Sequence, residues 1–96
     1  MSTLHMVRQS AFTSSSFKQC LQLALAGDCI VFIDDGCYCV THPLFEQLVQ
    51  SGSLALYIIN EQAKARGIPL HDKVEPIDMS DLVEVTFKTD NAITWQ

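Results

Sequence analysis

The chain has 96 residues, a formal net charge of −5 at pH 7 and a pI of about 4.8. An acidic chain without clustered Lys and Arg argues against direct binding to nucleic acid. No window reaches the roughly 18 consecutive apolar residues of a membrane span, and the first residues do not resemble a secretion signal. We therefore expect a cytoplasmic protein whose four cysteines are reduced thiols, without a membrane partner.

Hydrophobic residues make up 48% of the chain, and only 18% of the residues are charged. The mean hydropathy of +0.17 is high for a small soluble monomer, whose surface has to stay polar. One domain of this size buries a modest fraction of its surface by itself. The composition therefore predicts a single domain over residues 1–96 that associates with other chains.

The first elements are a short strand and an amphipathic helix. Residues 4–7 form the strand, and the hydroxyls of residues 13–16 precede the helix, with Ser16 and Gln19 at the spacing of a capping box. Apolar residues then recur at offsets of 3, 4, 7 and 8, on one face of a helix that ends before Gly27. The residues on this stripe are Phe17, Cys20, Leu21, Ala24 and Leu25.

A run rich in β-branched residues follows, bounded by Gly27 and Gly36. It is too short for a helix and lacks alternation, which indicates a strand covered on both faces, as in a parallel sheet. Ligands of such sheets bind beyond the carboxyl ends of the strands. We therefore treat the residues at this strand end as a candidate site. They are Asp34, Asp35, Gly36, Cys37 and Cys39.

The middle of the chain alternates helix and strand. A helical pattern, broken at Pro43, runs to residues 51–53, and residues 54–59 form a third strand. Asn60 is expected to cap a short helix that stops at Gly67, followed by a loop over residues 68–73.

The last quarter leaves one element open. Residues 74–77 read as a short strand, and Pro76 places it at an edge of the sheet. Residues 80–88 begin like a capped helix but contain alternating β-branched residues, so helix and strand both stay possible. Residues 94–95 form a small terminal strand. The pattern predicts a three-layer α/β/α fold around a mainly parallel sheet of four to five strands.

Cysteines supply the candidate chemistry. Cys20 lies on the apolar stripe of the first helix, where it is either a small core residue or, if exposed with a lowered pKa, a reactive thiol. Cys29 lies within the second strand and is expected in the core. Cys37, Cys39 and His42 resemble part of a zinc site that would take a fourth ligand from another histidine, but the paired spacing of zinc sites is absent. We therefore expect neither a metal nor an organic cofactor.

Asp34 and Asp35 resemble the acidic pair that holds Mg²⁺ in response-regulator receiver domains. The third strand ends in Ile58, Ile59 and Asn60, with no carboxylate where the phosphoacceptor would stand. The other interpretation is that Asp35 caps the next helix and Gly36 permits a tight turn. A stand-alone interaction or signalling domain that uses Asp34 and Asp35 remains the alternative, whereas no motif supports an independent enzyme.

The order of several short motifs along the chain resembles the DsrH/TusB family. The motifs are Leu4-His5, Gly27-Asp28, Asp35-Gly36, Ala65-Arg66-Gly67 after Tyr57, Ile77-Asp78 and the late Trp95. Each is weak alone, but their joint order and spacing cover almost the full length.

The resemblance implies a subunit of a sulfur-relay complex, a dimer of heterotrimers with DsrE/TusD-like and DsrF/TusC-like chains. Such complexes exchange persulfide sulfur with donor and acceptor carrier proteins, for 2-thiouridine at the tRNA wobble position in the TusB branch and for dissimilatory sulfur oxidation in the DsrH branch. Some members carry a cysteine in the first helix. Cys20 matches that position and is the candidate persulfide carrier of this chain, whose role is otherwise structural.

Overall fold

Five parallel strands form one sheet in the computed structural model, which describes residues 2–96. The strands are β1 (Thr3–Val7), β2 (Cys29–Phe32), β3 (Ala55–Ile59), β4 (Glu75–Ile77) and β5 (Asn91–Trp95). Their order in the sheet is β4-β3-β2-β1-β5. The helices are α1 (Ser16–Leu23), the 3₁₀ helix η1 (Asp34–Thr41), α2 (Pro43–Ser51), α3 (Asn60–Ala65) and α4 (Met79–Lys88).

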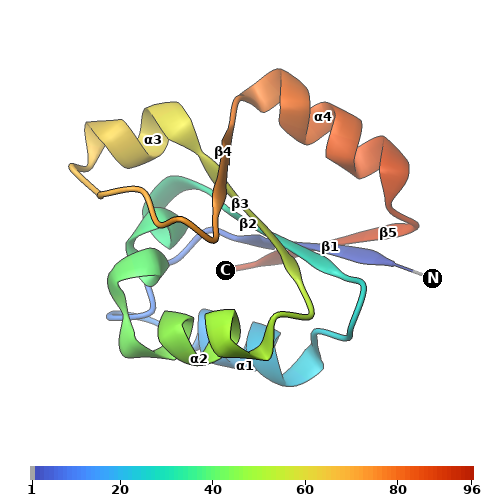
Figure 1. The fold of residues 1–96 in the computed structure, drawn as a ribbon, viewed down its shortest axis with the longest axis horizontal. Helices are drawn as coiled ribbons and strands as arrows, with labels where there is room; N and C mark the ends of the chain where they lie inside the picture. Colours follow the sequence, from blue (N-terminus) through green and yellow to red (C-terminus); the bar gives the residue numbers. More distant parts are fainter. Residues whose placement is uncertain (1) are drawn as a thin grey trace.

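Helices cover both faces of the sheet, which confirms the predicted α/β class (Figure 1). On one face, Phe17 of α1 and Phe45 of α2 pack edge-on against Phe32 of β2. On the other face, Leu82 of α4 joins a separate core cluster with strand residues such as Val31. All of β2 is buried, as its unbroken apolar run indicates.

The structure settles both elements of the last quarter of the chain: the predicted edge strand at residues 74–77 and the segment at residues 80–88, for which helix and strand were both possible. β4 lies at one edge of the sheet. An edge strand tolerates Pro76, which has no backbone N–H to donate to a neighbouring strand. Residues 79–88 form the helix α4, because Asp78 and Asp81 cap its first turn reciprocally: the Asp78 side chain accepts from the backbone N of Asp81, and the Asp81 side chain accepts from that of Asp78. The cap outweighs the β-branched residues within the segment.

Two predicted helix caps are wrong. Ser16 is the first residue of α1, and the cap position belongs to Ser15, which makes no capping hydrogen bond with its side chain. Asn60 is likewise the first residue of α3 and not its cap, and its Oδ1 atom is buried without a partner. In both cases the backbone enters the helix one residue earlier than the capping pattern indicates.

Gly36 has a different role from the predicted turn. Its φ is not positive, but a Cβ atom at this position would lie 1.8 Å from the carbonyl oxygen of Val7. The first turn of η1 therefore packs directly on the backbone at the end of β1, a contact that only glycine permits. Asp35 does not cap η1 either, since the residue before the helix, Ile33, provides no side-chain cap.

Candidate functional site

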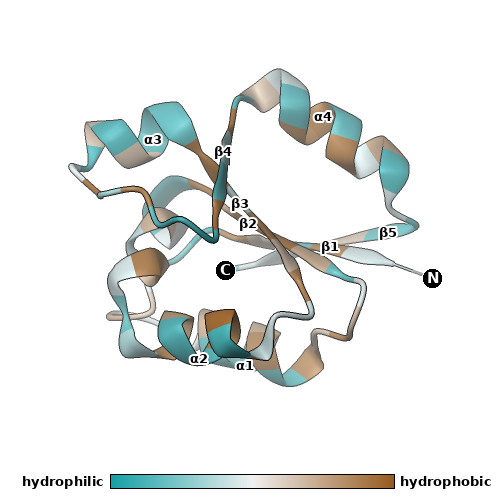
Figure 2. Cartoon of the chain, viewed as in Figure 1, coloured by the Kyte–Doolittle hydropathy of each residue, from teal (hydrophilic) through white to brown (hydrophobic). Residues whose placement is uncertain are grey.

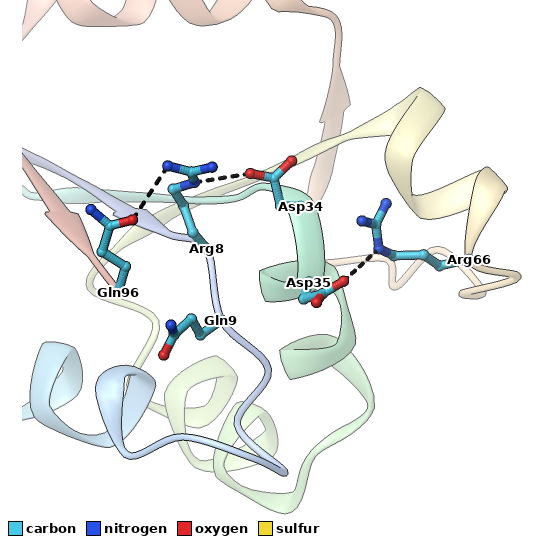
Figure 3. Close-up of a pocket in the computed structure, with 6 residues that line it drawn as sticks. All are labelled: Arg8, Gln9, Asp34, Asp35, Arg66 and Gln96. Atoms are coloured by element: carbon cyan, nitrogen blue, oxygen red, sulfur yellow. Dashed lines mark hydrogen bonds and ion pairs between the residues drawn. The ribbon is translucent and has the colours of Figure 1, made fainter.

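The carboxyl ends of β1, β2 and β5 meet at a polar hollow of about 390 Å³ (Figure 3). Asp34 and Asp35 follow β2, Arg8 and Gln9 follow β1, Gln96 follows β5 and Arg66 follows α3. This is the edge of the sheet that the sequence singles out as the candidate site.

Both candidate carboxylates are already paired with arginines. The Nε atom of Arg8 donates to Oδ2 of Asp34 at 2.9 Å, and Nε of Arg66 donates to Oδ1 of Asp35 at 3.1 Å. Arg8 also donates to Oε1 of Gln96 (Figure 3). These partly exposed pairs each contribute less than about 1 kcal/mol, but they balance the negative charge that would attract a cation.

The backbone at Asp34 is held in an unusual conformation. Its φ of +54° lies in the left-handed region, which aspartate adopts more readily than most residues. The amide of Asp34 donates to Oε1 of Gln62 in α3 at 2.7 Å. The carboxyl end of β2 is thus held by the side chains of Arg8, which follows β1, and Gln62 in α3.

Sequence reasoning missed the arginines and Gln62 because they come from segments far from residues 34–39. No local signal places Arg66 there: a helix that connects two parallel strands is expected to end near their amino ends, whereas α3 has only six residues and leaves Arg66 beside Asp35 at the carboxyl ends.

Cys20 lies in the core. Its side chain is 0% exposed, packed within the cluster that includes Phe17 and Phe32. Burial, with smaller contributions from the thiol of Cys39 and the carboxylate of Asp28, raises the pKa of Cys20 to about 12. Because the thiolate is the nucleophile in sulfur exchange, Cys20 is unreactive in this conformation.

The other three cysteines are also buried free thiols. The Sγ atom of Cys37 donates to the carbonyl of Phe32, and that of Cys39 donates to the carbonyl of Gln9. Burial raises the pKa of Cys37 to about 11 and that of Cys39 to about 12, and it also raises the pKa of Cys29. These thiols therefore serve as core residues, and those of Cys37 and Cys39 also donate to backbone carbonyls.

The residues that resemble part of a zinc site do not converge on one point. The Nδ1 atom of His42 accepts a hydrogen bond from the backbone N of Leu44, so this histidine caps α2. Among residues 2–96, no group of three or more His, Cys, Asp or Glu side chains could hold a metal ion. His42 is therefore a helix cap, and the cysteines near it are occupied by backbone contacts.

A buried polar network, which the sequence analysis did not identify, joins both ends of the chain. Oδ2 of Asp28 accepts from Nε2 of His5 and from the backbone N of Leu25, each at 3.0 Å, and Oδ1 accepts from the backbone N of Thr3. The indole Nε1 of Trp95 donates to Nδ1 of His5 at 3.1 Å. Because indole is only a donor, His5 carries its hydrogen on Nε2 and donates it to Asp28.

The comparisons with known proteins agree with this architecture. Residues 9–92 match the family model described as DsrH-like protein. The chain belongs to the DsrH-like family. It is 34% identical over 84 residues to Protein TusB of Photorhabdus laumondii, a match that covers 77% of this chain and 81% of that protein. The solution structure of protein Tm0979 from Thermotoga maritima matches the fold with a TM-score of 0.67 at 24% identity, over 90% of this chain and 92% of that one.

Motifs of the DsrH/TusB resemblance meet in space as two contact groups. His5, Asp28 and Trp95 form the buried network, which ties β1, β2 and β5 together. Asp35 and Arg66 form the ion pair over η1, whose first turn rests on β1 at Gly36. These residues thus have a physical role in the fold: the buried network links three neighbouring strands, and Asp35, Gly36 and Arg66 hold η1 at their carboxyl ends. No helix within residues 2–96 is long and apolar enough to cross a bilayer.

Proposed function

We propose that this chain is a subunit of a cytoplasmic, multichain sulfurtransferase that passes persulfide sulfur between cysteines, toward 2-thiouridine at the wobble position of tRNA. The observation that carries the proposal is the 34% identity to a protein named TusB over most of both chains, within the DsrH-like family. A DsrH-type subunit for dissimilatory sulfur oxidation is the second candidate, supported by the family model alone.

The geometry supports a subunit that depends on other chains for reactivity. All four cysteines are buried, and burial raises the pKa values of Cys20, Cys37 and Cys39 to about 11 to 12. The polar hollow at the sheet edge contains paired charges and no thiol. We therefore place the principal sulfur-carrying thiol on a partner chain, a DsrE/TusD-like one, and a DsrF/TusC-like chain completes the heterotrimer.

That Cys20 carries a persulfide stays a prediction, and in this fold it requires the buried thiol to become accessible. In the exchange step, the Cys20 thiolate attacks the outer sulfur of a donor persulfide. The donor's S–S bond breaks, a new S–S bond forms on Cys20, and the donor leaves as a thiolate, so that no oxidant is needed. The thiol of Cys20 lies on the buried face of α1. This step therefore requires α1 to move in the assembled complex.

Co-assembly tests the proposed function. Co-expressed with the DsrE/TusD-like and DsrF/TusC-like chains of its own organism, the chain is expected to elute from size-exclusion chromatography in one complex with both. Light scattering should give the mass of two heterotrimers. A chain that elutes alone, with the partners intact, would contradict the proposal.

Mass spectrometry tests the role of Cys20. After incubation of the assembled complex with a persulfide donor, peptides containing Cys20 should gain one sulfur, about 32 Da. The isolated chain should gain none, since its thiol is buried and protonated. Cys29, buried in β2, is the control and should stay unmodified. A loaded partner cysteine beside an unmodified Cys20 would show that this subunit is a scaffold.

A further inference from the structure

Helix α1 covers Cys20, and little within the helix itself holds it in place. It has eight residues, fewer than an isolated helix needs to be stable in water. Ser15, at its cap position, makes no side-chain capping hydrogen bond, and the helix has no acidic residue in its first turn and no basic residue in its last. Hydrophobic and hydrophilic residues are mixed along α1 (Figure 2), and its buried side chains are those of Ser16, Phe17 and Cys20. The position of α1 therefore depends on its contacts with the rest of the chain.

One carboxylate ties the end of α1 to the sheet. Asp28 lies between α1 and β2 and is 5% exposed. Its Oδ2 atom accepts at 3.0 Å from the backbone N of Leu25, just after the helix, and at 3.0 Å from Nε2 of His5 in β1. Its Oδ1 atom accepts from the backbone N of Thr3, at the start of β1. The same carboxylate thus holds the end of α1 and the first strand together.

Other hydrogen bonds at this end of α1 are local or long. The backbone N of Ala24 donates to the carbonyl of Cys20 within the helix. The backbone N of Gly27 donates to the carbonyl of Ser53 at 3.3 Å, beyond the usual range of such bonds. Hydrogen bonds to a charged group are about twice as strong as neutral ones. The bond to the carboxylate of Asp28 is therefore the strongest hydrogen-bonded link between the end of α1 and the sheet.

The side chains at this end of α1 do not anchor it. Leu23 is 62% exposed and Leu25 is 71% exposed, so neither is held in the core. Cys20 and Phe17 belong to the core cluster, about one and two turns before the end of the helix. An opening that lifts α1 alone breaks few buried contacts, and such local openings require less free energy than unfolding of the whole domain.

We propose that Asp28 is a latch for Cys20: its carboxylate holds the end of α1 against β1, and loss of the hydrogen bond from Leu25 lets α1 open and expose the Cys20 thiol while the sheet stays folded. Asp28 is thus a positioning residue for Cys20 and takes no part in sulfur exchange itself. The latch rests on the proposed function for its use, because sulfur exchange at Cys20 requires α1 to move. The opening of α1 is a property of the isolated chain and can be measured without partners.

Leu25→Pro tests the latch by removing one hydrogen bond. Proline lacks the backbone N–H that reaches Asp28, and Ala24 before it already has the extended conformation that a residue before proline favours, with φ −67° and ψ 134°. The side chain of Leu25 is exposed, so the substitution leaves the core unchanged. Leu25→Ala is the matched control, since it shortens the same side chain and keeps the N–H.

Alkylation of the isolated chain with N-ethylmaleimide measures the opening, with fragmentation mass spectrometry to locate each modified cysteine. Cys20 is expected to react at least tenfold faster in Leu25→Pro than in Leu25→Ala, because the lost bond is to a charged group. Cys29 is buried in β2, between two other strands, and is reached only when the sheet unfolds. It should therefore react at the same slow rate in both variants.

Low concentrations of urea distinguish local opening from unfolding of the whole domain. Urea accelerates a process in proportion to the surface that it exposes. Modification of Cys20 in Leu25→Pro should therefore respond weakly to urea, whereas that of Cys29 should rise steeply. Equal rates for Cys20 in the proline and alanine variants would overturn the latch. A urea response of Cys20 as steep as that of Cys29 would also overturn it, since Cys20 would then react only from the unfolded chain.

Persulfide loading separates the latch from the proposed function. Faster alkylation of Cys20 in Leu25→Pro, with no persulfide on Cys20 in the assembled complex, would support the latch and contradict a sulfur-carrying role for this thiol. A persulfide on Cys20 in the complex, with equal alkylation rates in Leu25→Pro and Leu25→Ala, would overturn the latch and leave the proposed function intact.

Discussion

A Gly36→Ala variant is expected to lose at least about 3 kcal/mol of unfolding free energy, enough to leave a small domain largely unfolded. The added Cβ would lie 1.8 Å from the carbonyl oxygen of Val7 and 2.6 Å from its carbonyl carbon. Because both are backbone atoms, no rotamer change relieves the overlap. The first turn of η1 would have to move away from β1, which would also displace the buried Cys37.

Gly52→Ala is the matched control for this prediction. Gly52 ends α2 with a φ of +64°, and a Cβ there meets no atom within 4 Å. Its substitution therefore costs only the strain of a left-handed alanine, about 1 kcal/mol. Urea denaturation followed by circular dichroism compares the two variants. If Gly36→Ala is no less stable than Gly52→Ala, the close approach at η1 is not essential to the fold.

The strands and most helices could be predicted because their signals are local. The apolar run of β2, the glycine that ends α3 at residue 67 and the proline of β4 each act through neighbouring residues. Starting positions of helices were less predictable. The serines before α1 offer several equivalent hydroxyls, and the structure uses Ser14, not Ser16, as the acceptor, receiving the backbone N of Ser16.

The candidate site could be predicted only in part. Its location at the carboxyl end of β2 follows from topology and is where the polar hollow lies. Its charge balance does not, because Arg8 and Arg66 approach from segments 26 and 31 residues away from their partners. The burial of Cys20 was one of two open interpretations, since the same helical stripe holds core residues and, farther along, the exposed Leu25.

An Asp28→Ala variant is expected to lose about 3 kcal/mol or more at neutral pH. Asp28 is 5% exposed and accepts hydrogen bonds from the backbone N atoms of Thr3 and Leu25 and from His5. Removing the carboxylate leaves the buried Nε2 of His5 and two partly buried backbone N–H groups without an acceptor. A buried donor without an acceptor costs about 1 to 3 kcal/mol, and a partly buried one costs less because water can reach it. The loss of the Asp28 partner should also release His5 and thus shift the fluorescence of Trp95, which donates to the same imidazole.

The pH dependence of stability gives this prediction a sharper test through Asp28→Asn. Burial raises the pKa of Asp28, but the hydrogen bonds from Leu25, His5 and Thr3 together lower it below its ordinary value. The carboxylate therefore stabilises the fold fully above its unfolded pKa of about 4, and this contribution is lost as the pH falls through the lower folded pKa. Asp28→Asn has no such loss. The gap in unfolding free energy between the unmodified chain and this variant should be widest at pH 7 and narrow toward pH 3.

Asp78→Asn separates the effect of the buried carboxylate from a general effect of acid. The pKa of Asp78 is also lowered, by hydrogen bonds from the backbone of Asp81 and from Ser80, but this carboxylate is exposed and caps α4. Asparagine caps a helix about as well as aspartate, so this substitution should change stability little at pH 7. The difference in unfolding free energy between the unmodified chain and Asp28→Asn could instead be small at pH 7, or equal at pH 7 and pH 3. Either result would show that the buried network does not stabilise the charged carboxylate. The ends of the chain would then be held together mainly by the β1–β5 ladder and the packing of Trp95.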